Sequence, residues 1–350
     1  MTHEEARALF PVLERKAYLN ASTFGPLARP TLEAIEREQR SEVEHGRFGK
    51  EYFERMLALR VEVRAALAGL VGVEPERVAL TGSTTDGCNI ALAGLELKPD
   101  DEIVTTDAEH FGLLGPLHAS GVRVVVTAAE PDAILAAITP KTRLLALSHV
   151  LWTTGAVLPV HELRERSGIP ILVDGAQSAG AVPVDAGGLD FYTISGQKWL
   201  CGPDSTGALV VADPDRLRVA RPSYFSQAGY EPTGRFEPQH GAARFDPNWL
   251  APSALAGLAT ALELAPDWGF ERAAGQASRC RELLAPHAEL VPADATLVSF
   301  RVDDPPALVA HLAEQDIVVR DLPGTGLVRA SCGWWTSDDD LARLAAGVAA

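Results

Sequence analysis

Two residues of opposite charge, Asp174 and Lys198, could do chemistry together because each follows a short apolar run. Asp174 ends the run 171–174, and Lys198 comes 24 residues later, just beyond the run 190–195. Ligands of α/β proteins bind outside the carboxyl ends of the strands. A lysine placed there can form a Schiff base with pyridoxal 5′-phosphate (PLP), and a carboxylate can keep the pyridine nitrogen of that cofactor protonated. The pair therefore predicts a PLP site, in which desolvation by the apolar segment lowers the pKa of Lys198 toward the neutral nucleophile.

A turn rich in hydroxyl groups, residues 81–87, follows one predicted strand and opens a helix. Backbone N–H groups and hydroxyls at a helix N-terminus suit a phosphate, although serine and threonine caps are common for structural reasons alone. Ser195 could add a further hydroxyl from the end of the strand that precedes Lys198. Neither the dinucleotide pattern GxGxxG nor the nucleotide pattern GxxxxGK[ST] occurs, so nucleotide binding lacks its motifs.

A histidine, His110, follows the predicted strand 101–105 together with Glu109. At the carboxyl end of a strand its imidazole could stack on the PLP ring or relay a proton. A solvated loop histidine is the alternative, just as Asp174 and Lys198 taken singly could be an ordinary strand end and a surface lysine. The combination of these residues is what favours catalysis.

The elements that must position these residues alternate in type between residues 77 and 212. Strands are expected at 77–80, 101–105, 122–127, 143–150, 169–174, 190–195 and 207–211, and helices at 86–95, 111–120, 131–138 and 159–167. Strands that alternate with helices predict a mostly parallel central sheet flanked by helices, and nearly continuous apolar runs indicate that both faces are buried. The predicted fold class is α/β.

The flanking parts of the chain have a different pattern. Helices are expected at 30–45, 51–70, 251–264, 268–284, 306–314 and 337–349, strands at 296–300, 317–320 and 326–331, and an irregular stretch at 221–247. A chain of 350 residues exceeds the size of one core. We therefore expect a large domain over 20–245, a smaller α+β domain over 246–350, and a segment 1–19 that packs with the small domain.

Composition excludes several classes of function. The net charge of −16 repels a phosphate backbone, so we expect no nucleic-acid partner. No apolar run approaches the roughly 20 residues needed to span a bilayer, and the acidic N-terminus lacks a secretion-signal pattern, so a cytoplasmic location is expected. The four cysteines and nine histidines lack metal-ligand spacing, and no metal is expected.

Ordered motifs over about 310 residues give the chain a family resemblance. It resembles the class V aminotransferase family of fold-type I PLP enzymes, which includes cysteine desulfurases, isopenicillin-N epimerase-like proteins and cystine C–S lyases. The segments that carry the resemblance are Tyr18–Asn20 with Gly25-Pro26, Thr84–Asp86 with Asn89, Glu109-His110, His149-Val150 with Thr154-Gly155 and Pro159, Asp174–Ser178, Ser195–Lys198 and Val328–Ser331.

The resemblance implies a role for each matching residue. Lys198 would carry the Schiff base and serve as the catalytic base, Asp174 would bind the pyridine nitrogen, Gln177 would bind the ring oxygen, His110 would stack on the ring, and Thr84, Thr85, Ser195 and Gln197 would hold the phosphate. Arg329 would bind the substrate carboxylate, because a guanidinium matches it bidentately. The resemblance also implies a homodimer, in which Asn248 is a candidate to reach the partner's phosphate.

Some residues depart from the family pattern. Gln197 stands where many relatives have histidine, and Trp152 stands where some have asparagine, so the tryptophan is a candidate to shape the substrate pocket. The aromatic residues downstream could line a substrate channel or pack in the core or a dimer interface; they are Tyr224, Phe225, Tyr230, Trp334 and Trp335.

The cysteines narrow the expected reaction. A cysteine desulfurase needs a nucleophilic cysteine shortly before the carboxylate-binding arginine, but the segment 320–329 has none, and Cys332 is expected to pack rather than react. We expect a C–S lyase that acts by β-elimination on cysteine or cystine, yielding pyruvate and ammonia. Transamination and epimerisation remain open, and a non-catalytic PLP-fold protein is the alternative of another class.

Overall fold

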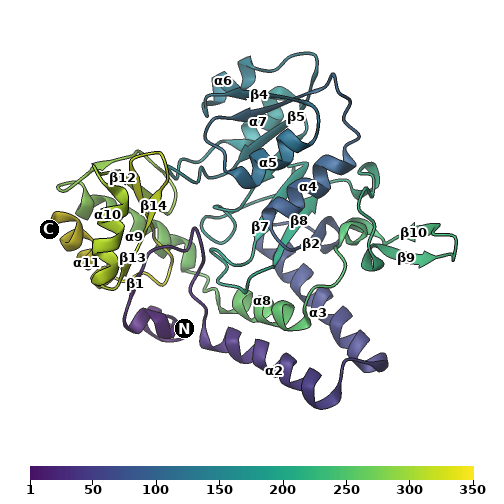
Figure 1. Ribbon diagram of the computed structural model, residues 1–350, viewed down its shortest axis with the longest axis horizontal. Coiled ribbons are helices and arrows are strands. Elements are labelled where there is room, and N and C mark those ends of the chain that lie inside the picture. The colour runs from purple at the N-terminus through teal and green to yellow at the C-terminus, as the bar shows by residue number, and fades with distance from the viewer.

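The computed structural model describes residues 1–350 as a large unit built on a seven-stranded sheet and a smaller unit that holds the C-terminus (Figure 1). The strand order of the large sheet is β2-β8-β7-β6-β5-β3-β4. Its strands are β2 (Val78–Thr81), β3 (Glu102–Thr106), β4 (Arg123–Thr127), β5 (Thr142–Ser148), β6 (Ile171–Asp174), β7 (Phe191–Ser195) and β8 (Gly207–Val211). All seven predicted strands are present.

The large sheet is mostly parallel, as the alternation of elements predicts. Strands β7, β6, β5, β3 and β4 pair in parallel, and β8 alone runs in the opposite direction, antiparallel to both β2 and β7. The carboxyl ends of the other strands therefore meet at one edge of the sheet. Binding sites of α/β proteins form at this edge.

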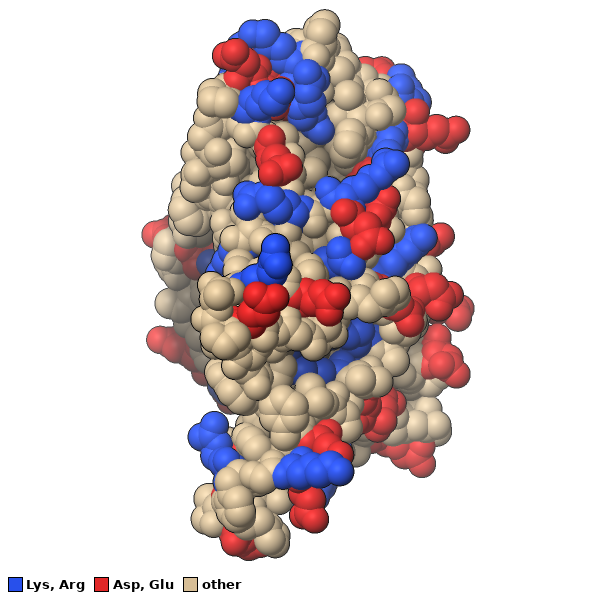
Figure 2. Space-filling model, turned by 90° about the vertical axis from the view of Figure 1, so that its right-hand side faces the viewer, with Lys and Arg blue, Asp and Glu red and all other residues tan.

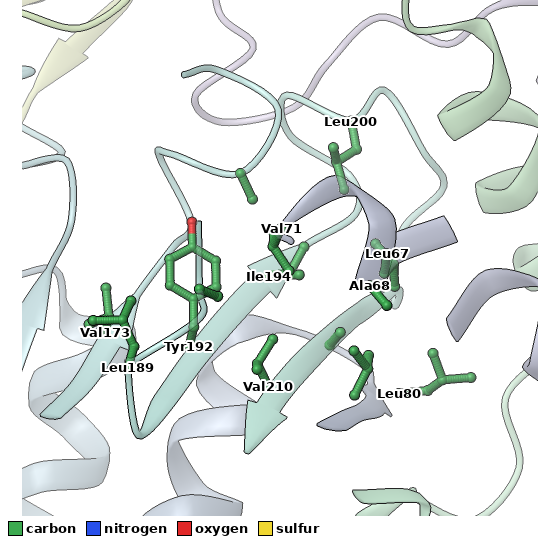
Figure 3. Close-up of a cluster of buried hydrophobic side chains, with 14 of the residues drawn as sticks. Leu67, Ala68, Val71, Leu80, Val173, Leu189, Tyr192, Ile194, Leu200 and Val210 are labelled. Carbon is green, nitrogen blue, oxygen red and sulfur yellow. The ribbon is translucent and has the colours of Figure 1, made fainter. Parts of the chain in front are cut away.

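Helices cover the large sheet on both faces, and two separate apolar clusters fill the space beneath them. In one cluster Leu67 and Val71 lie against Ile194 and Val210 of the sheet (Figure 3). The helices of this unit are α2 (Arg29–His45), α3 (Gly49–Leu70), α4 (Thr84–Gly94), α5 (Phe111–Ala119), α6 (Pro131–Ala136), α7 (Val160–Ser167) and α8 (Pro252–Leu264). Since strands β2, β3, β6, β7 and β8 are buried along their whole length, the continuous apolar runs are explained.

The small unit is a four-stranded antiparallel sheet of order β11-β12-β15-β14 with helices packed on it. Its elements are α9 (Gly269–Leu284), β11 (Glu289–Leu290), β12 (Leu297–Arg301), α10 (Pro305–Glu314), β13 (Ile317–Val318), β14 (Arg320–Leu322), β15 (Leu327–Ser331) and α11 (Asp338–Ala349). After the first helix, α1 (His3–Arg7), strand β1 (Ala17–Tyr18) pairs in parallel with β13. The domain boundaries after residues 19 and 245 stay a prediction, and α8, beyond the second of them, packs on α2 and α3.

The stretch 221–247 is less irregular than the sequence indicates. Strands β9 (Gln227–Tyr230) and β10 (Phe236–Pro238) form an antiparallel hairpin that projects from the large unit (Figure 1). Strands of three or four residues are too short to show a period in a Pro- and Gly-rich sequence, which is why the pattern does not reveal them.

The surface shows no single-sign field on the face seen in Figure 2. Basic and acidic side chains are interspersed across this face, so it offers no continuous basic stripe to a phosphate backbone. No helix of the chain combines the length and the apolar character that a bilayer crossing requires.

Candidate active site

A cavity of about 190 Å³ lies at the carboxyl edge of the large sheet. Its lining residues are Ser83, Thr84, Thr85, His110, Ser148, Val150, Trp152, Asp174, Ala176, Gln177, Ser195, Gln197 and Lys198. The strand ends of β5, β6 and β7 and the N-termini of α4 and α5 all contribute to it. The structure thus brings together eight of the PLP-binding residues that the sequence suggests, together with Trp152.

Lys198 lies just beyond β7 on a turn that only glycine permits. A Cβ at Gly196 would lie 2.0 Å from Thr206 Oγ1, so any larger residue would push the turn away from the sheet. The backbone is held on both sides, because Gly25 N–H donates to the Gln197 carbonyl at 2.8 Å and Cys201 N–H donates to that of Lys198 at 3.0 Å. Burial lowers the pKa of the Lys198 ammonium to about 8. A neutral amine, which a nucleophile and a base both require, is therefore accessible near neutral pH.

Asp174 ends β6 and is 4% exposed. The N–H of Ala176 donates to its Oδ1 at 2.8 Å, which fixes the orientation of the carboxylate. A Cβ at Gly175 would lie 2.3 Å from the Thr193 carbonyl, so glycine lets the chain turn tightly against β7. The buried carboxylate and the lysine are consequently presented by adjacent parallel strands.

His110 caps the N-terminus of α5 and faces the cavity. Its Nδ1 accepts a hydrogen bond from Gly112 N–H at 3.0 Å, which places the proton of the neutral ring on Nε2. Trp152 stands edge-on to the imidazole, with 5.1 Å between the ring centroids. Burial first, and then the charge of Lys198, lower the pKa of His110, so the ring is neutral at physiological pH.

The N-terminus of α4 forms a hydroxyl-rich end of the cavity. Ser83 caps this helix by accepting from Asp86 N–H, while Thr84 and Thr85 occupy its first turn. A Cβ at Gly112 would lie 2.8 Å from Thr85 Oγ1, so the glycine lets α4 and α5 approach each other. In the same cavity, Ser195 Oγ donates to Gln197 Oε1 at 2.7 Å. Hydroxyls and the free N–H groups of a helix N-terminus make this end suited to a phosphate.

Gln177 is buried in the lining of the cavity, with both ends of its amide held. Its Nε2 donates to the Ser22 carbonyl at 3.0 Å, and its Oε1 accepts from Trp199 Nε1 at 2.9 Å. An amide nitrogen carries two hydrogens. One N–H of Gln177 therefore remains for a ring oxygen in the cavity.

Arg329 lies in β15 and is 1% exposed, with its guanidinium beside Trp152. It donates to the Trp152 carbonyl, and its Nε has no partner. Sequence reasoning missed Arg320, which pairs directly with Arg329 in the antiparallel β14–β15 ladder and donates to Thr23 Oγ1 at 3.0 Å. The charges of both arginines act on Lys198 and His110. Arg320 begins a strand of only three residues, which is too short for an alternation of polar and apolar side chains to predict which way Arg320 points.

A buried carboxyl group that sequence reasoning named without a role, Glu109, lies beneath the cavity. It accepts hydrogen bonds from Thr106 Oγ1 at 2.8 Å and from the backbone N–H and the hydroxyl of Ser148. Burial raises the pKa of Glu109 to about 7, against the opposing effect of these hydrogen bonds.

Asn248 lies outside this cavity. Its side chain is exposed, and its carbonyl accepts from Arg60 at 2.7 Å. None of the five downstream aromatic residues lines the cavity either: Trp334 and Trp335 are buried in a core cluster beside Phe10, and Tyr224 and Tyr230 are exposed. All four cysteines are buried and unpaired, and Cys332 is 0% exposed, so it packs as the sequence predicts.

A second cavity, of about 460 Å³, lies behind Trp199 and is larger but mostly apolar. It contains neither Lys198 nor Asp174. The smaller cavity is the candidate active site because the titratable and phosphate-binding groups converge there.

The side chains present fit PLP as a cofactor. Lys198 is partly buried and has no salt-bridge partner, Asp174 offers a fixed carboxylate, and the N-terminus of α4 offers phosphate donors in the same cavity. An imine-forming amine, a pyridine partner and a phosphate cradle are the groups that bind PLP.

Comparison with known proteins agrees with this fit. The family model described as aminotransferase class-V matches residues 18–321. Isopenicillin N epimerase from Streptomyces clavuligerus is 30% identical, with 98% of this chain and 96% of that protein aligned. A probable cysteine desulfurase from Methanothermobacter thermautotrophicus is 30% identical over 60% of this chain and 56% of its own length.

Two solved structures of one protein, C-DES, are similar over nearly the whole chain. The complex of this cystine C–S lyase with its reaction product cysteine persulfide superposes with a TM-score of 0.90 at 31% identity, covering 97% of this chain and 99% of that one. A lysine-to-alanine mutant of C-DES, with glycine covalently linked to PLP, gives 0.91 at 31% identity, covering 98% of each chain. These neighbours confirm the predicted fold-type I architecture and the predicted cofactor.

Proposed function

Since the chain belongs to the class V aminotransferase family of PLP-dependent enzymes, we propose that it cleaves the Cβ–S bond of cystine or a cysteine-type amino acid by β-elimination. The observation that carries the proposal is a partly buried lysine in a cavity that no cysteine lines, under the charge of two arginines that have no acidic partner and lie outside the lining of that cavity. The likeness to a cystine C–S lyase over nearly the whole chain supports it.

The cofactor, when bound, supplies an electron sink that stabilises negative charge at the substrate α-carbon. Asp174 would hold the proton on the ring nitrogen, and Thr84, Thr85, Ser195 and Gln197 would hold the phosphate. Gln177 would donate its remaining N–H to the ring oxygen, and His110 would cover the ring. Each of these side chains lines the cavity.

Lys198 would carry the cofactor in the resting enzyme and take the α-proton once the substrate amine has displaced it. A base must be neutral to accept that proton, and burial brings the pKa of Lys198 to about 8 for this purpose. No other amine lines the cavity. The same side chain would therefore act as carrier and base.

The two arginines would bind carboxylate. Arg329 is fully buried and holds an unpartnered Nε, so one carboxylate of the substrate would relieve an uncompensated charge. Arg320 stands next to it in the ladder. Cystine carries two carboxylates, which matches two paired cations whose charges act on Lys198 and His110. Trp152, between Arg329 and His110, would shape the pocket around the substrate.

The elimination breaks the Cα–H and Cβ–S bonds, forms a double bond between Cα and Cβ, and conserves all atoms. The α-proton goes to Lys198, the Cβ–S bond breaks, and its electron pair leaves with sulfur as a persulfide anion. Hydrolysis of the remaining three-carbon fragment consumes one water and releases pyruvate and ammonia. Cystine and water thus yield pyruvate, ammonia and cysteine persulfide, without a thiol of the enzyme.

An assay of pyruvate and persulfide from cystine tests the proposal. Purified PLP-loaded protein should form the two products in equal amounts, and the mutant Lys198→Ala should form neither. A parallel incubation with a 2-oxo acid acceptor detects transamination. New amino acid in that incubation, without pyruvate from cystine, would reject the lyase activity.

Epimerisation is the second candidate, because an isopenicillin N epimerase is 30% identical over nearly the whole chain. Removal of the α-proton is common to both reactions, and they differ in whether a group leaves Cβ or the proton returns. Loss of optical rotation from a substrate without a Cβ leaving group, in the absence of pyruvate, would favour it.

The proposal includes a homodimer in which Asn248 reaches the partner's cofactor phosphate. Asn248 is exposed next to Trp249, which is 59% exposed and stacks on Tyr224 at 6.2 Å. Exposed aromatic residues are typical of protein interfaces. Asn248→Ala should weaken PLP binding without changing the dimeric mass in solution; a monomeric wild-type protein would contradict it. A cytoplasmic location remains a prediction.

A further inference from the structure

A buried carboxylate that the proposed reaction does not use, Glu109, lies directly beneath the cavity. It is 5% exposed and follows β3 by three residues. Its two oxygens accept from Thr106 Oγ1 at 2.8 Å, from Ser148 N–H at 3.0 and 3.1 Å, and from the Ser148 hydroxyl. A carboxylate is costly to bury without such partners, so its retention here calls for a reason.

Glu109 connects two of the groups that would face the cofactor. His110 is the next residue in the chain and caps α5. Ser148, which Glu109 holds through both its backbone and its side chain, pairs with Asp174 in the β5–β6 ladder. The following residue, His149, donates its N–H to the Asp174 carbonyl at 3.1 Å. The Glu109 carboxylate thereby connects two segments. One is the loop after β3, which contains His110, and the other is the end of β5, which pairs with the Asp174 end of β6.

The backbone N–H of Ser148 is the contact that requires an acceptor, and it donates to both oxygens of Glu109. The hydroxyls of Thr106 and Ser148 also donate to Glu109, although a hydroxyl can accept as well, and an ionised carboxylate accepts from all three groups. Glutamine has the same shape, but its NH₂ group cannot accept from the Ser148 N–H. The substitution therefore removes one of the two hydrogen bonds of this N–H, and the loop must shift to keep the other.

We propose that Glu109 is a positioning residue, which sets the relative placement of His110 and Asp174 by fastening the end of β3 to Ser148. The inference rests on the proposed roles of His110 and Asp174 at the cofactor. It predicts that the charge and reach of Glu109 affect the bound cofactor, although Glu109 itself does not line the cavity.

The test compares Glu109→Gln with Glu102→Gln. Glu102 is a matched control because it begins the same strand, is 2% exposed, and accepts from Arg123 at 2.9 Å and from Thr139 at 2.5 Å, away from the cavity. Three quantities are measured for each PLP-loaded variant: the absorption maximum of the bound cofactor, its Kd from titration of the apoprotein, and kcat and KM separately.

Glu109→Gln is expected to shift the absorption maximum, raise the Kd for PLP and lower kcat by about 10- to 100-fold, since small displacements of catalytic groups have effects of that size. KM should change little, because Arg320 and Arg329 are untouched. Glu102→Gln should leave all of these unchanged even where it lowers the melting temperature. The proposal is overturned if the Glu109 variant matches wild type, or if both variants change the cofactor equally.

A second variant covers the case in which Glu109→Gln does not fold. Thr106→Val removes the other hydroxyl that donates to Glu109, at a buried residue that does not line the cavity, and should produce a smaller change in the same direction; an unaltered spectrum and Kd would then overturn the proposal. The spectrum and the Kd need no substrate. If wild-type protein forms no pyruvate from cystine, the proposed function fails while these two readouts still decide the role of Glu109.

Discussion

Arg320 and Arg329 stand directly opposite each other on neighbouring antiparallel strands, and no carboxylate of the chain balances either charge. Like charges in direct register destabilise a sheet. The burial of Arg329 and the charge of Arg320 both lower the pKa of the Arg329 guanidinium, which means that the charged form of Arg329 is destabilised at this position. A pair of cations kept at this cost, whose charges act on Lys198 and His110, is arranged for an anionic substrate rather than for stability.

Replacing either arginine should therefore impair substrate binding and leave the cofactor in place. Arg329→Ala is expected to raise KM by about 10- to 100-fold, because a change of that size corresponds to the loss of one hydrogen bond between charged groups. Arg320→Ala should affect cystine more than cysteine, since cystine has the second carboxylate. The measurement is steady-state kinetics with both amino acids, and Arg301→Ala serves as control because Arg301 is an exposed residue of the neighbouring strand. Equal losses with cystine and cysteine in the Arg320 variant would contradict its assignment.

Lys198→Ala should abolish turnover without unfolding the protein. Removal of a general base alone costs about 10²- to 10⁴-fold in rate, and loss of the covalent link adds to it. Absorbance of the bound cofactor should change to that of free aldehyde, and sodium borohydride should no longer attach PLP to the protein. Lys141→Ala, at an exposed lysine, should behave as wild type. Borohydride labelling that persists in the Lys198 variant would place the link elsewhere.

The rate at which apoprotein takes up PLP should depend on pH with a midpoint near 8. Imine formation needs the neutral amine, and burial lowers the pKa of Lys198 to about 8, so the neutral fraction increases up to that pH and then levels off. Stopped-flow absorbance from pH 6 to pH 10 measures this rate. A rate that still increases steeply between pH 9 and pH 10 would mean that the lysine keeps the ordinary pKa of an exposed ammonium.

Thiol reagents should leave the activity unchanged. Cys88, Cys201, Cys280 and Cys332 are all buried. Burial raises the pKa of Cys201, and a hydrogen bond with Cys280, followed by burial, raises the pKa of Cys332, so none offers a reactive thiolate. Iodoacetamide should add no mass to native protein and should label the same cysteines after denaturation. Rapid inactivation with the label on Cys332 would revive the persulfide mechanism of a desulfurase.

The sequence by itself determined the fold class and the placement of Lys198, Asp174, His110 and the phosphate turn. These residues lie next to apolar runs whose lengths and alternation with helices are local properties of the chain. Parallel strands that alternate with helices share one carboxyl edge, so residues that follow different strands were expected to meet there. The structure brings them into one cavity.

Only the tertiary structure decided which distant residues join them. The register of the β14–β15 ladder places Arg320 opposite Arg329, and the packing of the β3 loop on β5 attaches Glu109 to Ser148. It also separates Asn248 from the cavity of its own chain and buries Trp334 and Trp335 in the core. Strand register and side-chain packing arise from contacts between segments far apart in sequence, and no local pattern encodes them.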